Sequence, residues 1–230
     1  MPNRPPGIGR AALMIARKDL LIELRSRSAI FSALAFSVLA LAVFFFAWDP
    51  TAVGSGDLAS GVIWVIFTFS GMLGLHRSFG GEQPTRTIDA LIAAPVAGEA
   101  VFLGKGLANL VFVAMVQIVT LPAAALLYNV PLVPVALPLA GVVLAAAIGL
   151  VAIGTLFSAM AVNTRLAELL LPLLSLPFFV PIVICASQAT AKLMAGRPVS
   201  DAADYLRLLV VFDAVAVVLS TLVYPSLIEQ

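Results

Sequence analysis

Long apolar stretches dominate the pattern of hydrophobic and polar positions along this chain. Only Glu168, Arg207 and Asp213 are charged within them. Six stretches are found, at residues 29–48, 58–75, 107–128, 135–162, 167–186 and 205–228. A helix needs about 20 apolar residues to cross a bilayer, and each stretch comes close to that length or exceeds it. The pattern predicts an all-α integral membrane protein with six transmembrane helices. It does not fit a β-barrel, whose strands would alternate apolar and polar side chains.

The composition narrows the possible function classes. Of the 230 residues, 62% are hydrophobic and 11% are charged, the mean hydropathy is +1.11 and the formal net charge is +1. Ordinary soluble domains are nearer half apolar and a quarter charged, so a soluble enzyme is excluded. Nothing in the charge balance points to nucleic acid as a partner.

Candidate catalytic and metal-binding chemistry is sparse. Cys185 is the sole cysteine and His76 the sole histidine, so one chain cannot build a disulfide, a bis-histidine haem site or a cysteine and histidine metal site. The phosphate-binding sequence G-x-x-x-x-G-K-[ST] does not occur, and the chain is expected to hydrolyse no ATP by itself. We therefore expect a non-catalytic membrane protein, with no metal and no cofactor bound by this chain alone.

The positions of the basic residues predict the topology. With both termini in the cytoplasm, ten of the thirteen Lys and Arg residues fall in segments on the inner side, as the positive-inside rule favours. We divide the chain into an N-terminal tail with an interfacial helix, residues 1–28, and a six-helix transmembrane domain, residues 29–228. The first helix is expected from about Ile8 to Ser28, as an elbow lying along the inner leaflet or, alternatively, as a plain basic flank that fixes the topology.

Three polar residues interrupt the apolar spans. Asn109 and Gln117 lie on roughly the same face of the third span, where they are expected to bond to neighbouring helices. Asp213 lies well inside the sixth span, and a carboxylate at that depth must face protein or water. For Asp213 a structural hydrogen bond and a direct part in conformational change or substrate contact are equally compatible with the sequence.

The longest predicted cytoplasmic loop, residues 76–106, reads HRSFGGEQPTRTIDALIAAPVAGEAVFLGKG. Thr87 begins a short capped amphipathic segment that ends before Pro95, and Lys105 follows at the predicted membrane edge. A short cytoplasmic helix in this position, preceded by an acid, resembles the coupling helix of exporter-type (ABC-2) ABC permeases, which have six spans and an N-terminal elbow. The resemblance implies that residues of this loop contact an ATPase subunit. They are Glu82, Thr87, Ile88, Asp89, Leu91, Pro95 and Lys105.

Five longer sequence segments point to one family among these permeases. They are SGVIWVIFTFSGMLGLHRSF, TIDALIAAPV, FLGKGLANLVF, TLFSAMAVNTRLAELLLPLLSLPFFVPIVI and YLRLLVVFDAVAVVLSTLVYPSLIE. Together they resemble the CcmB family, the permease subunit of the ABC complex for cytochrome c maturation. The resemblance runs from about Lys18 to Glu229, and its most specific parts are the span around Trp64, the loop from Asp89 to Lys105, and Asn163-Thr164-Arg165.

The resemblance implies a complex in the bacterial inner membrane. Two permease chains would pair with two CcmA ATPases, and CcmC and CcmD would complete a complex that acts on the haem chaperone CcmE. ATP bound by CcmA would drive either haem export or release of haem-loaded CcmE, so haem is a possible cargo of the complex. Two alternatives are an exporter permease for a lipid, glycan or drug, and a membrane scaffold without an ATPase partner.

Overall fold

The computed structural model describes residues 7–80, 97–161 and 167–228. This part of the chain contains seven α-helices, one short 3-10 helix and no strand. They are α1 (Ile8–Ser26), α2 (Ser28–Ala47), α3 (Ser55–Gly80), α5 (Gly98–Tyr128), η1 (Val133–Val135), α6 (Ala136–Ala161), α7 (Ala167–Met194) and α8 (Val199–Ile228). Every α-helix except α1 is long and apolar enough to cross a membrane, which gives six spans in the described residues. The predicted all-α architecture with six spans is confirmed.

The ends of several helices differ from the predicted limits of the spans. α3 continues to Gly80 and α5 begins at Gly98, so both helices extend into the predicted cytoplasmic segment 76–106. The apolar pattern stops at Lys105, but a helix tolerates charged residues in its first turns, and Glu99 in the first turn of α5 suits the positive end of the helix dipole. Lys105 therefore lies within a helix and not in a loop.

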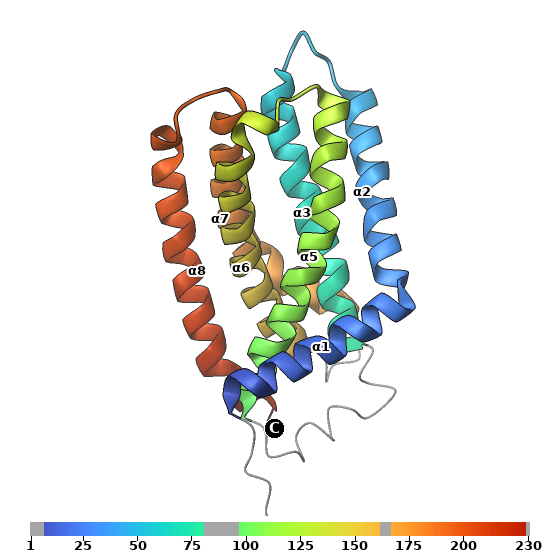
Figure 1. Ribbon diagram of the computed structural model, residues 1–230, viewed down its shortest axis with the longest axis vertical. Helices are drawn as coiled ribbons and strands as arrows, with labels where there is room; N and C mark the ends of the chain where they lie inside the picture. Colours follow the sequence, from blue (N-terminus) through green and yellow to red (C-terminus); the bar gives the residue numbers. More distant parts are fainter. Residues whose placement is uncertain (1–6, 81–96, 162–166, 229–230) are drawn as a thin grey trace, which may run out of the picture.

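α1 is a separate helix that crosses one end of the bundle, the end at which α8 also terminates (Figure 1). It begins at Ile8, as predicted, and ends at Ser26. Arg27 alone separates it from α2, with a left-handed backbone at φ 55°. The Arg27 N–H donates to the Glu23 carbonyl at 2.7 Å, which satisfies one of the last carbonyls of α1. This one-residue turn redirects the chain from α1 into the first span.

α3 is the central span of the bundle. Of its most apolar window 72% is buried, against 22% for α2 and for α8. The indole N–H of Trp64, which is fully buried, donates to the Thr190 hydroxyl of α7 at 3.0 Å. A Ser37–Ser70 hydrogen bond of 3.0 Å joins α2 to α3 in the same way. Hydrogen bonds between helices supplement van der Waals packing where no hydrophobic effect drives helices together.

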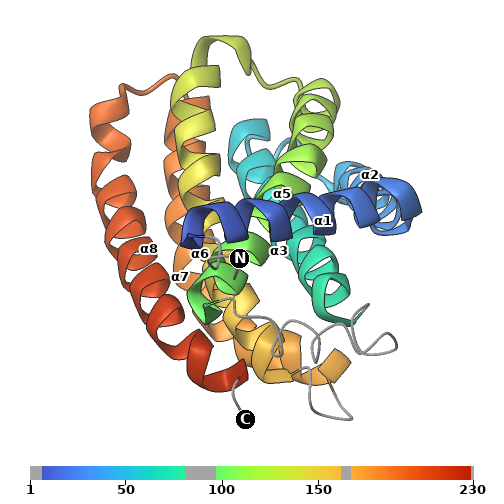
Figure 2. The same cartoon turned by 60° about the horizontal axis from the view of Figure 1, so that its bottom comes forward.

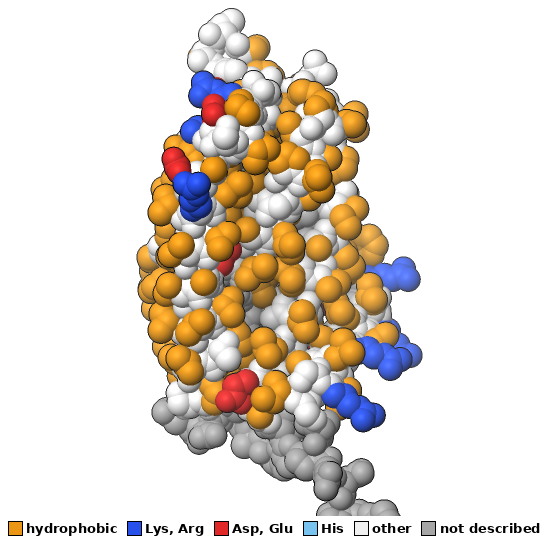
Figure 3. Space-filling model, turned by 60° about the vertical axis from the view of Figure 1, so that its left-hand side comes forward, with side chains coloured by type: hydrophobic (Ala, Val, Ile, Leu, Met, Phe, Trp, Pro, Cys, Tyr) orange, Lys and Arg blue, Asp and Glu red, His pale blue; other side chains and the backbone are white. Residues whose placement is uncertain are grey.

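The outer surface of the spans is apolar. Leu126, Leu137 and Phe46 are more than four-fifths exposed on α5, α6 and α2. Figure 3 shows hydrophobic side chains over most of one face, with charged side chains gathered toward its upper end, along the lower part of its right edge and near its lower end. A contiguous apolar belt of this kind is typical of a surface covered by lipid or by other membrane helices.

The connection between α2 and α3 contains an Asx turn. The hydroxyl and the backbone N–H of Thr51 donate to Oδ1 of Asp49 at 2.7 and 2.9 Å. These hydrogen bonds stabilise the charged carboxylate and lower the pKa of Asp49 below its ordinary value.

Candidate functional site

α1 packs closely on the first turns of α5, next to the predicted coupling loop. α1 turns a row of small residues and one isoleucine toward the protein, at Ala11, Ala12, Ile15 and Ala16. Gly104 of α5 lies directly against this row: a Cβ at Gly104 would come within 2.7 Å of Ile15 Cβ and 2.8 Å of the Ala12 carbonyl oxygen. The two helices cross where α5 has no side chain to separate them (Figure 2).

A buried ion pair joins the same two helices. The Lys105 side chain is 2% exposed, and its Nζ lies 3.6 Å from Oδ2 of Asp19. Asp19 Oδ1 also lies 3.0 Å from Nζ of Lys18 on α1. Lys105, expected at the membrane edge, thus lies inside the fold, and its charge is neutralised by an acid 86 positions earlier in the chain. A buried charge is tolerated only when it is paired in this way.

The start of α5 also contacts α6 and α8. Phe102 of α5 packs on Tyr224 of α8, with ring centroids 5.3 Å apart. Gly98, the first residue of α5, approaches Pro225 so closely that a Cβ would come within 2.9 Å of the Pro225 Cα. We call the buried residues here the inner cluster, and they are Ile15, Val101, Phe102, Ala152, Ala159 and Tyr224. The inner cluster contains residues of α1, α5, α6 and α8, next to the residues that follow the predicted coupling loop.

Most of the predicted ATPase-coupling residues lie outside the described residues. They are Glu82, Thr87, Ile88, Asp89, Leu91 and Pro95. Their assignment remains a prediction, as does the short coupling helix that they are expected to form. The helices that flank them, α3 and α5, are described up to Gly80 and from Gly98.

The polar residues predicted on the third span are both buried on α5. Asn109 is 4% exposed and Gln117 is 3% exposed, as expected of side chains that face the protein. Neither Nδ2 of Asn109 nor Oε1 of Gln117 has a hydrogen-bond partner among the described residues. The expected hydrogen bonds from these two atoms to neighbouring helices are therefore not formed within the described part of the chain.

Asp213 faces the protein interior, as its depth in the sixth span requires. Its side chain lies against Gly149 of α6, so closely that a Cβ on Gly149 would overlap the carboxylate, and Ile182 of α7 adjoins the same spot. Oδ1 of Asp213 has no hydrogen-bond partner among the described residues. The absence of a side chain at Gly149 is what gives the carboxylate room between three helices.

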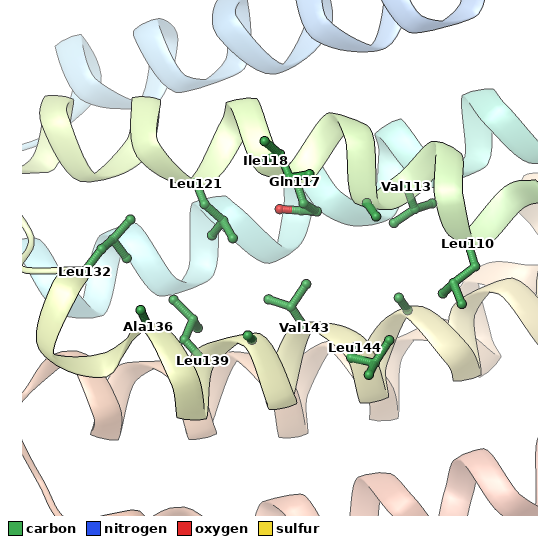
Figure 4. A pocket seen from close by; sticks show the side chains of 13 residues that line it. Leu110, Val113, Gln117, Ile118, Leu121, Leu132, Ala136, Leu139, Val143 and Leu144 are labelled. Carbon is green, nitrogen blue, oxygen red and sulfur yellow. The ribbon is translucent and has the colours of Figure 1, made fainter. Parts of the chain in front are cut away.

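A groove of about 340 Å³ runs between α5 and α6. Its walls come from residues 110–121 of α5, residues 136–147 of α6 and Leu132 in the connection between them. We refer to it as the α5–α6 groove. Its lining is apolar except for Gln117, whose side chain points from α5 into the space between the two helices (Figure 4).

Within residues 7–80, 97–161 and 167–228, no group of three or more His, Cys, Asp or Glu residues could hold a metal ion. Cys185, which is partly buried on α7, is a free thiol.

The comparison with known protein families covers nearly the whole chain. The model described as CcmB protein matches residues 10–230. The chain belongs to the CcmB family. The match includes α1 from its third residue, all six spans and the predicted coupling loop, so the resemblance noted in the sequence from about Lys18 to Glu229 is confirmed over its full length.

Curated relatives of this CcmB-family chain are similar over most of their length. Heme exporter protein B of Rhodobacter capsulatus is 29% identical over 175 residues, which cover 76% of this chain and 80% of the relative. Heme exporter protein B of Paracoccus denitrificans is 29% identical over 196 residues, covering 85% and 88%. The protein of the same name from Pseudomonas aeruginosa is 25% identical over 189 residues, covering 82% and 84%.

Sequence reasoning missed two residues that shape this CcmB-family site. The sequence assigned no role to Gly104 or Asp19, yet Gly104 permits the contact between α1 and α5 and Asp19 pairs with Lys105. A lysine directly before an apolar span suggests that an acid lies nearby, if the lysine is buried. The sequence contains several acids near the cytoplasmic ends of the spans, and nothing in it selects Asp19 among them.

Proposed function

We propose that this CcmB-family chain is the transmembrane permease subunit of an ABC transporter for cytochrome c biogenesis. Its role would be to couple ATP hydrolysis by the ATPase CcmA to haem export or to release of haem-loaded CcmE. The observation that carries the proposal is the family match over residues 10–230, together with six candidate spans. The name heme exporter protein B, shared by the relatives, supports haem as the cargo of the complex.

In this proposal the ATPase docks on residues 82–95 and on the side chains predicted there. Ile88 and Leu91 would insert into a groove on the ATPase, with Glu82, Thr87, Asp89 and Pro95 shaping the segment. The position of this segment between α3 and α5 supports the assignment, because α5 leads from it directly into the inner cluster.

The packing around α5 supports a rigid path for the motion. A displacement of the α5 start would act on α1 through Gly104 and the Asp19–Lys105 pair, and on α8 through Phe102. Close-packed contacts transmit displacement because they have no voids to absorb it. Lys105 therefore contributes to coupling as a link between helices inside the permease, in addition to its place next to the loop.

The proposed complex contains a second copy of this chain, two CcmA subunits, CcmC, CcmD and CcmE. CcmA binds the ATP, and this chain binds no cofactor of its own and performs no catalysis. The protein would lie in the bacterial inner membrane with both termini in the cytoplasm, surrounded by lipid. The basic residues Arg10, Arg17, Lys18 and Arg25 of α1, together with Arg27 directly after it, support this orientation. α1 itself crosses one end of the bundle (Figure 1).

Deletion of the chain tests the proposal and separates its two versions. Cells without it should lose c-type cytochromes, and a plasmid copy should restore them. Haem-loaded CcmE that stays bound to CcmC in the deletion strain would favour the release version, whereas CcmE without haem would favour export. Undiminished c-type cytochromes would overturn the proposed function.

A further inference from the structure

The α5–α6 groove lies open along the outer surface of the bundle. It extends over residues 110–121 of α5 and residues 136–147 of α6, about 17 Å or three helical turns along each helix. Leu132 lies in the connection between these helices, so the groove occupies the half of the bundle next to that connection.

The residues that line the groove are of the types that bring helices together in membranes. Small side chains, Ala114 on α5 and Ala136 and Ala140 on α6, are exposed along it. Ile118 and Leu144 stand at its edges, 72% and 55% exposed. Small residues allow close approach of a helix backbone, and larger apolar residues beside them provide the walls.

Gln117 places an oxygen that needs a hydrogen-bond donor in the middle of this apolar surface. The residue is 3% exposed, and its Oε1 has no hydrogen-bond partner among the described residues. Leaving such an oxygen unpaired in an apolar environment is costly. The terminal torsion of glutamine is broad, so the carboxamide can turn toward a donor in the groove at low cost.

We propose that the α5–α6 groove binds a transmembrane helix of another membrane protein, and that this helix presents a hydrogen-bond donor to Oε1 of Gln117. Three turns of a helix match the length of the groove, the alanines accept its backbone, and a hydroxyl, amide or indole N–H in its apolar stretch satisfies the glutamine. The proposal does not depend on ATPase docking, which involves the opposite end of α5.

Two other occupants fit the groove less well. A lipid acyl chain fills apolar space but has no donor, so Gln117 Oε1 would stay unpaired. A second copy of this chain, bound through a two-fold axis at the groove, would bring the grooves of the two copies face to face and fill neither of them. The surfaces of α2 and α8 offer no comparable unpaired group at Ser32 or Thr221, because the hydroxyls of these residues already donate to carbonyls of their own helices.

Site-specific photocross-linking in intact membranes tests the proposal. A benzophenone amino acid replaces Ile118 at the edge of the groove, or Val119, which is 47% exposed but does not line it, as the matched control. The expected adduct forms at Ile118 and not at Val119. Its cross-linked peptide, identified by mass spectrometry, should be a membrane-spanning segment of a different protein with a Ser, Thr, Asn, Gln, Tyr or Trp side chain.

Two further substitutions tie the adduct to the groove. Ala140→Leu fills the groove and should abolish the adduct, whereas Ala214→Leu, at an exposed alanine of α8, should leave it unchanged. Gln117→Leu should weaken association about three- to thirty-fold, the loss expected for one interhelical hydrogen bond. Membrane levels of each variant control for folding. A lipid adduct alone, an adduct with a second copy of this chain, no adduct, or an adduct that Ala140→Leu leaves intact would overturn the proposal.

Discussion

At the scale of single residues, the environment of Asp213 shows what the structure adds to the sequence. Its depth among apolar residues required a protein-facing side chain, and the carboxylate lies against Gly149 with Ile182 beside it. Which residues it meets depends on how α6, α7 and α8 pack. A pattern along one helix does not contain that information.

We expect Asp213→Asn to preserve assembly and cytochrome c maturation, because asparagine keeps the shape that fits against Gly149. Asp213→Leu should destabilise the complex by about 1–3 kcal/mol, since a larger apolar side chain overfills the space at this glycine. Thermal unfolding of the purified complex measures the loss. Val211→Leu, at a 63% exposed position of the same helix, serves as the control.

The same pair of variants separates a structural role from a functional one. If the charge of Asp213 takes part in the ATP-driven rearrangement, Asp213→Asn should assemble normally and fail in maturation. Normal assembly and maturation with Asp213→Leu would show that neither role applies.

The Asp19–Lys105 pair makes a second prediction at this scale. A double-mutant cycle with Asp19→Asn, Lys105→Met and both together should give a coupling free energy of about 0.5–3 kcal/mol, because each change alone disrupts a buried ion pair. Thermal unfolding in detergent supplies the four values. Additive effects of the two changes would mean that the side chains do not interact.

At the scale of helices, the six spans were predicted correctly from the sequence, whereas the polar ends of some helices were predicted poorly. Hydropathy identifies a span because every side chain on the lipid-facing surface must be apolar. It fails near Lys105, where a charge is buried inside the protein by pairing and the helix continues to Gly98. The extension of α7 to Met194 was missed for a similar reason, because its last turns carry the polar residues Thr190 and Lys192.

The contact between α1 and α5 leads to a prediction with a matched control on one helix. Gly104→Ala should destabilise the protein by about 1–3 kcal/mol, because the new Cβ would collide with Ile15 Cβ and the Ala12 carbonyl of α1. Gly106→Ala should be neutral or slightly stabilising, since its Cβ would meet only Val151 at 3.9 Å. Equal thermal stability of the two variants would contradict the close packing of α1 on α5.

The orientation of the helices is open to direct measurement. After Cys185→Ala, we expect Arg197→Cys, in the exposed link between α7 and α8, to react with an impermeant thiol reagent in cells with a permeabilised outer membrane. Gln83→Cys, in the loop assigned to the cytoplasm, should react only after the inner membrane is opened. The reverse pattern would invert the topology derived from the positive-inside rule.

At the scale of the whole molecule, the family and the number of spans could be predicted from the sequence, whereas the arrangement of the helices could not. Hydropathy does not show that α3 is central, that Trp64 reaches Thr190, or that the start of α5 meets α1 and α8. Membrane helices associate through detailed packing and isolated hydrogen bonds, and these depend on which helix faces lie together. The α5–α6 groove is a further result of that arrangement.

The central claim is that this chain transmits the action of an ATPase through the segment between α3 and α5. The most direct measurement is recovery of CcmA with the affinity-purified chain from membranes. Wild type and the control Ala90→Asp with Ala93→Asp, which puts the same charges on neighbouring positions, should retain CcmA. Ile88→Asp with Leu91→Asp should lose it while the chain is still inserted at the wild-type level, because the apolar face that enters the ATPase groove is removed. Undiminished CcmA with the Ile88 and Leu91 variant, or no CcmA with the wild type, would contradict the account.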